Sequence, residues 1–297
     1  MMKSTMFKGA GVALVTPFKA DGSVDFEGLT KLLEMQIENK TDAIIICGTT
    51  GEASTMPDSE HLAVIKHAVK IVDGRIPVIA GTGSNDTAHG IELAKEAESL
   101  GVDGLLLVTP YYNKASKKGL IMHYSAIANS VKIPICLYNV PSRTGVNIPI
   151  DVLKELSKID NIVAIKEASG NMSYAMKVAA EVPELDLYSG NDDMIVPFLS
   201  IGGKGVISVV SNILPLDTHN ICEYYFKGEV EKSKDLQLKM LELINNLFIE
   251  VNPIPVKAAM NLMGLPSGNL RLPLCDIEDS NKEILKNSMI KYGIKLV

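Results

Sequence analysis

The chain has 297 residues, of which 46% are hydrophobic, and it carries a net charge of −6 at pH 7. That length is enough to bury a full core, and α/β barrels use it for a single domain. The acidic balance argues against a nucleic-acid-binding protein, which would show a basic stripe, so small molecules or further copies of the chain are the expected partners.

Eight short apolar segments recur along the chain, and each ends in polar or glycine residues. They are rich in Val, Ile and Leu and nearly continuous rather than alternating, which is typical of strands buried on both faces of a parallel sheet. The segments cover residues 11–16, 43–47, 77–80, 104–108, 134–138, 162–165, 185–188 and 205–209.

Amphipathic stretches of helical period separate these segments. In residues 25–39, for example, one stripe contains Phe26, Leu29, Leu32, Leu33 and Gln36. Strand–helix units in series favour a parallel sheet, and eight units in roughly 230 residues match the size of a closed (β/α)8 TIM barrel. The alternative is a doubly wound open sheet, which usually has fewer strands and a phosphate-binding loop after the first one. The further helical stretches cover residues 59–72, 86–100, 117–130, 150–158, 172–181, 194–201 and 215–227.

The residues after the eighth unit show helical patterns at 230–251, 253–263 and 277–294. This stretch is short of strand-like segments and too small for a second domain. We therefore predict an α/β chain in which residues 1–227 form the barrel. Residues 228–297 are expected to form a helical C-terminal extension packed on it.

Cysteine and histidine spacings give no sign of a metal or redox site. Cys47, Cys136, Cys222 and Cys275 form no CxxC pair, and the five histidines lack metal-binding spacing. No apolar run approaches the roughly 20 residues that span a membrane, and the first residues lack the apolar core of a signal peptide. We expect a cytoplasmic protein that binds no metal and no membrane.

Lys166 is the most informative residue at the predicted catalytic rim, which in such barrels is formed by the carboxyl-terminal ends of the strands. It directly follows the apolar segment 162–165. Buried lysines are rare, and burial favours the neutral amine, which attacks a ketone to form an imine. The alternative interpretation is a structural ion pair of Lys166 with Glu167 or Glu52.

Hydroxyl groups near Lys166 favour the catalytic interpretation. Tyr138 ends the adjacent predicted strand, and a phenol transfers protons at hydrogen-bond range. Thr49 and Tyr112 could relay those protons, although Tyr111 and Tyr112 fit a packing or interface pair equally well.

Two further features at this rim suit carboxylates. The loop Gly48-Thr49-Thr50-Gly51 offers hydroxyls and backbone N–H groups, and it lacks the spacing of a P-loop. Arg143, in the loop after the fifth segment, presents a planar fork that matches a carboxylate. An isolated arginine is more often a solvated or structural one.

Four motifs together resemble the 4-hydroxy-tetrahydrodipicolinate synthase (dihydrodipicolinate synthase) family over nearly the whole chain. The resemblance implies a Schiff-base lyase of diaminopimelate and lysine biosynthesis. Such an enzyme condenses pyruvate with L-aspartate 4-semialdehyde to give 4-hydroxy-tetrahydrodipicolinate. The motifs are Gly48-Thr49-Thr50-Gly51-Glu52, Tyr138-Asn139-Val140-Pro141-Ser142-Arg143-Thr144-Gly145, Lys166-Glu167-Ala168-Ser169-Gly170 and Asn252-Pro253-Ile254-Pro255-Val256-Lys257.

The resemblance implies a role for each site residue. Lys166 forms the imine with pyruvate, and the proton relay consists of Tyr138, Thr49 and, from a neighbouring subunit, Tyr112. Pyruvate's carboxylate is held by Thr49 and Thr50, while that of the semialdehyde binds Arg143, and the backbones of Gly190 and Ile207 line the site.

The resemblance also implies a homotetramer built from tight dimers. It implies that no metal or organic cofactor takes part, because the lysine itself supplies the electron sink.

Arg143 separates this function from its nearest alternatives. The related N-acetylneuraminate lyases share the barrel, the loop and the lysine, but they typically lack an arginine here because their aldehyde partner is a sugar. Relatives that act on 2-keto-3-deoxy sugar acids are a second alternative of this kind. A non-catalytic barrel that senses a keto acid belongs to a different class, and we would expect it to have lost Lys166, Tyr138 or Arg143.

Several members of the family bind lysine as a feedback inhibitor in a cleft at the dimer interface. His89 stands where inhibited members usually carry a glutamate that pairs the lysine amine, and Asp58 stands where they often carry a histidine. An imidazole is a poor partner for an ammonium, so we predict weak or absent inhibition by lysine. The positions that would line the cleft here are Ala53, Ser54, Asp58, His61, Asn85, His89 and Tyr111.

Overall fold

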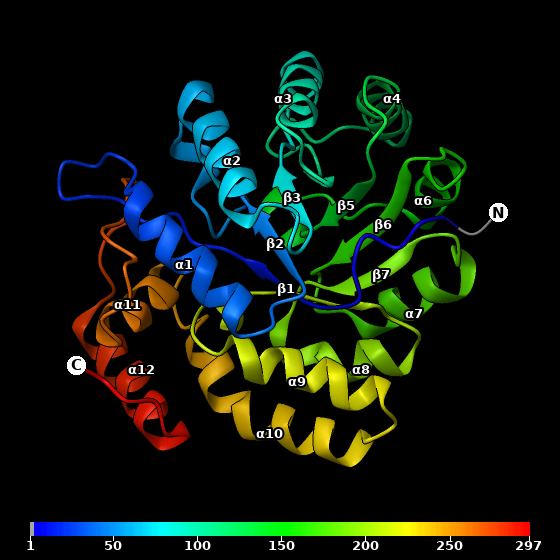
Figure 1. Cartoon of the computed structure of the whole chain (residues 1–297). Coiled ribbons are helices and arrows are strands. Elements are labelled where there is room, and N and C mark those ends of the chain that lie inside the picture. Colours follow the sequence, from blue (N-terminus) through cyan, green and yellow to red (C-terminus); the bar gives the residue numbers. More distant parts are fainter. Residues whose placement is uncertain (1–2) are drawn as a thin grey trace.

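The computed structural model describes residues 3–297 and contains a closed barrel of eight parallel strands in chain order (Figure 1). The eighth strand pairs with the first, which excludes an open sheet. The predicted (β/α)8 barrel is therefore confirmed. The strands are β1 (Gly9–Ala13), β2 (Ala43–Ile46), β3 (Val78–Gly81), β4 (Gly104–Val108), β5 (Ile135–Asn139), β6 (Ile162–Glu167), β7 (Asp186–Ser189) and β8 (Gly205–Ser208).

Helices surround the barrel and cover the outer face of the strands (Figure 1). They are α1 (Phe26–Glu38), α2 (Asp58–Val72), α3 (Thr87–Ser99), α4 (Lys117–Ala128), α6 (Ile150–Leu156), α7 (Met172–Glu181), α8 (Ile195–Ser200) and α9 (Pro215–Phe226). Short helical turns follow four of the strands: η1 (Ala53–Thr55), α5 (Pro141–Thr144), η2 (Asp192–Met194) and η3 (Val210–Asn212).

Side-chain caps define where several helices begin. The Asp25 carboxylate accepts from Gly28 N at 3.0 Å before α1, and Asn171 Oδ1 accepts from Tyr174 N at 3.1 Å before α7. Each cap satisfies a backbone N–H that has no partner within its helix. The predicted stripe of α1 faces the core, with Leu29, Leu32 and Leu33 buried.

The strands alternate between the barrel interior and the surrounding helices. In β2, Ile45 belongs to the interior cluster, whereas Ile44 and Ile46 pack in the outer cluster. This period of two places every second residue inside the barrel. The same alternation directs Tyr138 on β5 inward, next to the side of β6 that carries Lys166.

The first strand lies two residues earlier than the predicted segment 11–16 and ends at Ala13. Residues 14–16 are buried, but they form the start of a loop: Leu14 N donates to Ile45 O at 3.0 Å, and Val15 N donates to Asn212 Oδ1 at 3.1 Å. The apolar pattern therefore indicated correctly that residues 14–16 are buried, but not that they lie outside the sheet. At the other end, Gly205 allows close contact with β1, since a Cβ there would lie 1.8 Å from Gly9 O.

Three helices follow α9: α10 (Val230–Asn246), α11 (Ile254–Leu262) and α12 (Asp279–Tyr292). In Figure 1, α10 lies outside α9, while α11 and α12 lie together near α1. Their buried residues belong to the same cluster as those of the barrel helices. The C-terminal helical extension is confirmed, while the domain division at residues 227 and 228 stays a prediction.

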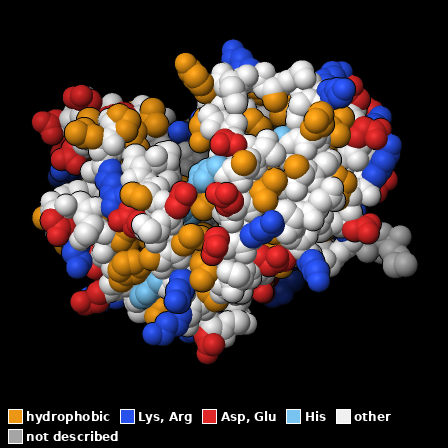
Figure 2. All heavy atoms as spheres, turned by 90° about the horizontal axis from the view of Figure 1, so that it is seen from above, with side chains coloured by type: hydrophobic (Ala, Val, Ile, Leu, Met, Phe, Trp, Pro, Cys, Tyr) orange, Lys and Arg blue, Asp and Glu red, His pale blue; other side chains and the backbone are white. Residues whose placement is uncertain are grey.

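Among residues 3–297, every helix is too short or too polar to cross a membrane. The face that carries α2, α3 and α4 shows acidic, basic and hydrophobic side chains interspersed (Figure 2).

Candidate active site

A cavity of about 180 Å³ opens at the carboxyl-terminal ends of the barrel strands. Strand ends and the loops that follow them supply most of its walls, as expected for a site in this fold. The residues that line it are Ala13, Ile45, Gly48, Thr49, Thr50, Leu106, Tyr138, Val140, Ser142, Arg143, Lys166, Ala168, Gly190, Asn191, Val209, Phe248 and Asn252.

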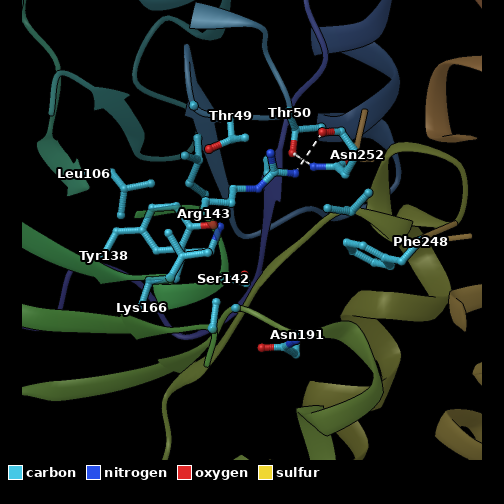
Figure 3. A pocket seen from close by; sticks show the side chains of 17 residues that line it. Thr49, Thr50, Leu106, Tyr138, Ser142, Arg143, Lys166, Asn191, Phe248 and Asn252 are labelled. Carbon is cyan, nitrogen blue, oxygen red and sulfur yellow. Dashed lines mark hydrogen bonds between the residues drawn. The ribbon is translucent and has the colours of Figure 1, made fainter. Parts of the chain in front are cut away.

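Lys166 and Tyr138 lie side by side in this cavity (Figure 3). They are register partners on β6 and β5, and Lys166 Nζ lies 4.3 Å from the centroid of the Tyr138 ring. The Lys166 residue is only 6% exposed. The arrangement places an amine and a phenol against the same small space.

The structural ion pair considered for Lys166 is absent from residues 3–297. Glu52 instead binds Lys257 at 2.7 Å. The Glu167 carboxylate accepts hydrogen bonds from Asn139 Nδ2 and from Ser169 N, each at 2.6 Å. Burial raises the pKa of Glu167. Lys166 is thus a buried amine without a carboxylate partner in this part of the chain.

Gly190 makes room for the Lys166 side chain. A Cβ at position 190 would lie 3.1 Å from Lys166 Cε and 2.5 Å from Ala168 Cβ. The predicted role of Gly190 as a lining residue therefore agrees with its place in the cavity, and the absence of a side chain is what allows it.

Thr49 and Thr50 follow β2 and line the upper part of the cavity in Figure 3. Asn252 Nδ2 donates to Thr50 Oγ1 at 2.9 Å. Because Thr50 Oγ1 accepts this bond, its own O–H proton stays free to donate to a ligand. The loop can therefore present hydroxyl donors to an anion.

Arg143 extends from α5 across the mouth of the cavity toward Asn252 (Figure 3). Its Nη2 donates to Asn252 O at 2.9 Å, so Asn252 contacts both Thr50 and Arg143. A guanidinium has five N–H donors, so this bond leaves capacity for a carboxylate.

Asp192 stabilises the backbone at the end of β8, next to this cavity. Its Oδ2 accepts from Val209 N at 2.9 Å and Val210 N at 2.8 Å. Burial raises the pKa of this carboxyl, while the hydrogen bonds from Ser208, Val210 and Val209 oppose the rise. Val209, held in this way, lines the cavity.

Two predicted site residues lie away from this cavity. Ile207 packs within the barrel interior cluster and is not among the lining residues. Tyr112, in the loop after β4, is 90% exposed and adopts a φ of 70°, in the left-handed region. The chain by itself does not bring Tyr112 to Lys166.

The predicted lysine-cleft residues gather around a second cavity of about 480 Å³. Ala53, Ser54, Asp58, His61, His89 and Tyr111 line it, and Asn85 Nδ2 donates to Tyr111 O at 3.2 Å. His89 Nε2 lies 3.0 Å from Asp58 Oδ1, and burial lowers the pKa of His61. Weak or absent lysine inhibition stays a prediction.

Asn252 and Phe248 line the active-site cavity, although the sequence pattern assigned neither of them a role. Asn252 belongs to a motif that supported the family resemblance, whereas Phe248 follows α10 in a stretch that reads as ordinary helix. Residues 3–297 contain no cluster of three or more His, Cys, Asp or Glu side chains arranged to hold a metal.

A profile of the Dihydrodipicolinate synthetase family matches residues 6–291. This chain belongs to that family. The 4-hydroxy-tetrahydrodipicolinate synthase of Caldicellulosiruptor saccharolyticus is 60% identical over 291 residues, covering 98% of this chain and 99% of the relative. The enzyme of the same name from Clostridium perfringens strain SM101 is 59% identical, covering 97% and 99%.

Solved structures of the dihydrodipicolinate synthase family share the fold closely. The dihydrodipicolinate synthase of Acinetobacter baumannii, solved in complex with pyruvate, is 44% identical to this chain. It superposes with a TM-score of 0.95 and covers 98% of this chain and 100% of its own. The family assignment thus rests on sequence and on three-dimensional structure alike.

Proposed function

We propose that this chain is a 4-hydroxy-tetrahydrodipicolinate synthase that condenses pyruvate with L-aspartate 4-semialdehyde through an imine on Lys166. The observation that carries the proposal is the buried Lys166 amine beside Tyr138, in a cavity rimmed by Thr49, Thr50 and Arg143. The names of relatives about 60% identical over nearly the whole chain support the same reaction.

The first half of the reaction needs a neutral amine and a proton shuttle. The Lys166 amine attacks the keto carbon of pyruvate, and the resulting carbinolamine loses water to give the imine. Tyr138, whose ring contacts Lys166, can donate the proton that leaves with this water. The Tyr138 phenolate left by that step can then take a proton from the methyl group to give the enamine, while the Thr50 hydroxyl is placed to hold the carboxylate.

The second half needs a site for a second carboxylate. The enamine carbon attacks the aldehyde carbon of aspartate 4-semialdehyde; the aldehyde oxygen takes a proton to become a hydroxyl, and the imine on Lys166 is restored. The amino group of the semialdehyde then attacks the imine carbon, which closes the ring and releases Lys166. Arg143, at the mouth of the cavity, is positioned to bind the carboxylate of this substrate.

A sugar-acid substrate is the competing function within the same chemistry. A sugar aldehyde would be recognised by neutral hydroxyl partners rather than by a guanidinium. Arg143 at the cavity mouth therefore favours the semialdehyde.

We further propose that the working form is a homotetramer built from dimers and that Tyr112 completes the relay in a neighbouring subunit. A non-glycine residue with φ of 70° is strained, and such strain persists where the surroundings maintain it for function. The exposed phenol is free to enter another subunit. A cytoplasmic location is part of the same proposal.

The direct test is a coupled assay with pyruvate, aspartate 4-semialdehyde, NADPH and the reductase that consumes the product. We expect turnover on the order of 1 s⁻¹ or faster, as is typical of enzymes, and none above background for Lys166→Ala. Turnover only with N-acetylmannosamine or a deoxy-sugar-acid aldehyde in place of the semialdehyde would contradict the proposed substrate.

A further inference from the structure

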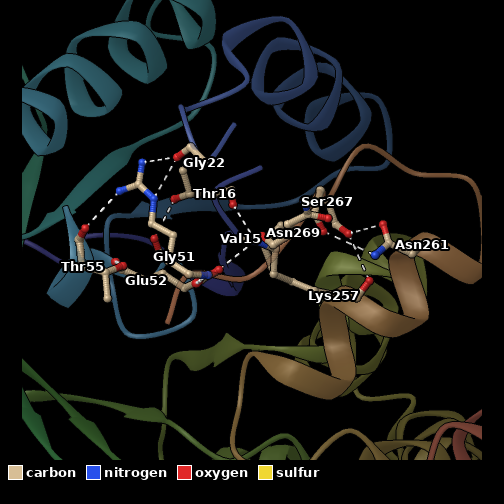
Figure 4. A network of polar contacts seen from close by, with 12 residues as sticks. Val15, Thr16, Gly22, Gly51, Glu52, Thr55, Lys257, Asn261, Ser267 and Asn269 are labelled. Carbon is tan, nitrogen blue, oxygen red and sulfur yellow. Dashed lines mark hydrogen bonds and ion pairs between the residues drawn. The ribbon is translucent and has the colours of Figure 1, made fainter. Parts of the chain in front are cut away.

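Lys257 and Glu52 form an ion pair that is almost completely shielded from solvent (Figure 4). Lys257 Nζ lies 2.7 Å from Glu52 Oε1, and each side chain is 1% exposed. Burial lowers the pKa of Lys257. Buried ion pairs are weak sources of stability, because the loss of hydration offsets the attraction between the charges. A conformational role is the better explanation for this pair.

The Lys257 ammonium joins three segments that lie far apart in the sequence. Besides Glu52, it donates to Thr16 O at 3.0 Å and to Asn269 O at 2.6 Å. These contacts use all three donors of the ammonium. Lys257 therefore ties α11 to the loop after β1, the loop after β2 and the segment that follows α11.

The loop after β2 needs such support because its backbone is strained at two points. Cys47 and Glu52, neither of them glycine, adopt φ angles of 54° and 55°. Residues held in the left-handed region persist where their surroundings fix them. Gly81 contributes from one side, since a Cβ there would lie 2.4 Å from Cys47 O.

Between these two strained residues lie Thr49 and Thr50, which line the active-site cavity. Thr16 Oγ1 donates to Gly51 O at 2.7 Å, directly beside Thr50. The second carboxylate oxygen of Glu52 accepts from Arg271 N at 3.1 Å. Contacts at Gly51 and Glu52 thus hold the backbone directly after Thr50.

We propose that Lys257 is a positioning residue for the condensation: through Glu52 it fixes residues 47–52 in the geometry in which Thr49 and Thr50 receive the pyruvate carboxylate. The inference rests on the proposed function. Lys257 itself lies outside the cavity and touches no reacting atom.

The test measures the pyruvate concentration that gives half-maximal borohydride trapping of the full-length chain. In Lys257→Met, a folded variant should need about tenfold more pyruvate or more, since displaced hydroxyls would lose a hydrogen bond to the carboxylate, and bonds to charged groups contribute at least that factor. The maximal amount of trapped adduct should stay near that of the parent, because Lys166 and Tyr138 are unchanged.

Lys257→Met leaves the Glu52 charge buried without its cation. The double variant Glu52→Gln/Lys257→Met is therefore tested alongside it. This double variant removes both charges, so that no unpaired charge is left in the interior. It should show the same rise in half-saturating pyruvate. If neither variant folds, the pair is required by the fold as a whole and the positioning role is refuted.

Leu153→Ala is the matched control, since Leu153 is fully buried on α6, which packs mainly against α4 and α7, so its truncation destabilises the core away from Lys257 and α11. Its half-saturating pyruvate should stay within about twofold of the parent, since distant sites that share no partners act independently to within about 0.5 kcal/mol. A folded Lys257→Met protein that also stays within that range would overturn the inference. If the parent chain traps no pyruvate, the proposed function fails instead, so the two failures are distinguishable.

Discussion

At the scale of single residues, the chemistry depends on where the Lys166 side chain can lie. Its amine is held on one side by the Tyr138 ring, and its stem is held against Gly190. In a close-packed site there is little room for adjustment when an atom is added. The absence of a side chain at position 190 is thus as much a part of the site as the amine itself.

Gly190→Ala should therefore slow imine formation. The new methyl group would lie 2.5 Å from Ala168 Cβ and would push against the Lys166 stem. We expect the rate of borohydride trapping with pyruvate to fall by about 10- to 100-fold. Gly119→Ala is the control, because a Cβ there meets its neighbours at 3.4 Å, an ordinary contact distance. An unchanged trapping rate in Gly190→Ala would show that Lys166 has freedom that the structure does not suggest.

Arg143→Ala should separate the two halves of the reaction. Arg143 donates to Asn252 O, and its guanidinium is directed toward Thr50 and Asn252 at the cavity mouth (Figure 3). We expect kcat/KM for the semialdehyde to fall about 10- to 100-fold, the effect of losing hydrogen bonds between charged groups. Borohydride trapping of pyruvate in the absence of the semialdehyde should be unchanged. Arg143→Lys should recover part of the loss, since it restores the charge but not the fork. Equal losses in both measurements would contradict a role confined to the second substrate.

At the scale of secondary-structure elements, the sequence predicted what depends on local periodicity. The eight strands follow from apolar segments, and the positions of Lys166 and Tyr138 follow from where those segments end. Residues 14–16 were misassigned to a strand because a buried loop and a buried strand have the same apolar composition.

The sequence pattern could not predict contacts between elements that lie far apart in the chain. Asn252 meets Thr50 across 202 positions, and Lys257 meets Glu52 across 205. No periodicity within either segment encodes these pairings, which arise only when the chain after the barrel folds back on the loop after β2. The same holds for Phe248, whose place at the cavity depends on how α10 ends.

His219 links α9 to the start of β2 and should make stability depend on pH. Its Nδ1 lies 2.9 Å from Asp42 Oδ2, and this hydrogen bond raises the pKa of His219 in the folded state. The stabilisation is then fully present below the unfolded-state pKa of about 6.5, and it is lost as pH rises through the higher folded-state value. His219→Gln should lower the free energy of unfolding by about 0.5–1 kcal/mol at pH 6. The difference in unfolding free energy between the parent and His219→Gln should shrink as pH approaches 9.

The control variant is His67→Gln. For both variants, the free energy of unfolding is measured by urea titration at the same pH values. Burial lowers the pKa of His67, so its protonation favours the unfolded state as pH falls. Replacement of His67 should therefore help stability at low pH, the opposite trend. A His219→Gln difference that is constant from pH 6 to pH 9 would exclude the proposed link.

At the scale of the whole molecule, the isolated chain has an incomplete relay, because Tyr112 points into solvent. If Tyr112 acts in a neighbouring subunit, Lys166→Ala and Tyr112→Ala chains should complement each other when they are co-expressed. Random pairing gives half mixed dimers, each with one complete site of two, so we expect about one quarter of the parent activity. Activity no greater than the sum of the two separate variants would contradict a shared site.

The central claim is that Lys166 forms an imine with pyruvate, and the most direct measurement is borohydride reduction with pyruvate followed by peptide mass spectrometry. We predict one reduced pyruvate adduct per chain, located on the peptide that contains Lys166 and absent from the Lys166→Ala variant. No adduct in the parent chain, or an adduct on another lysine such as Lys257, would contradict the account.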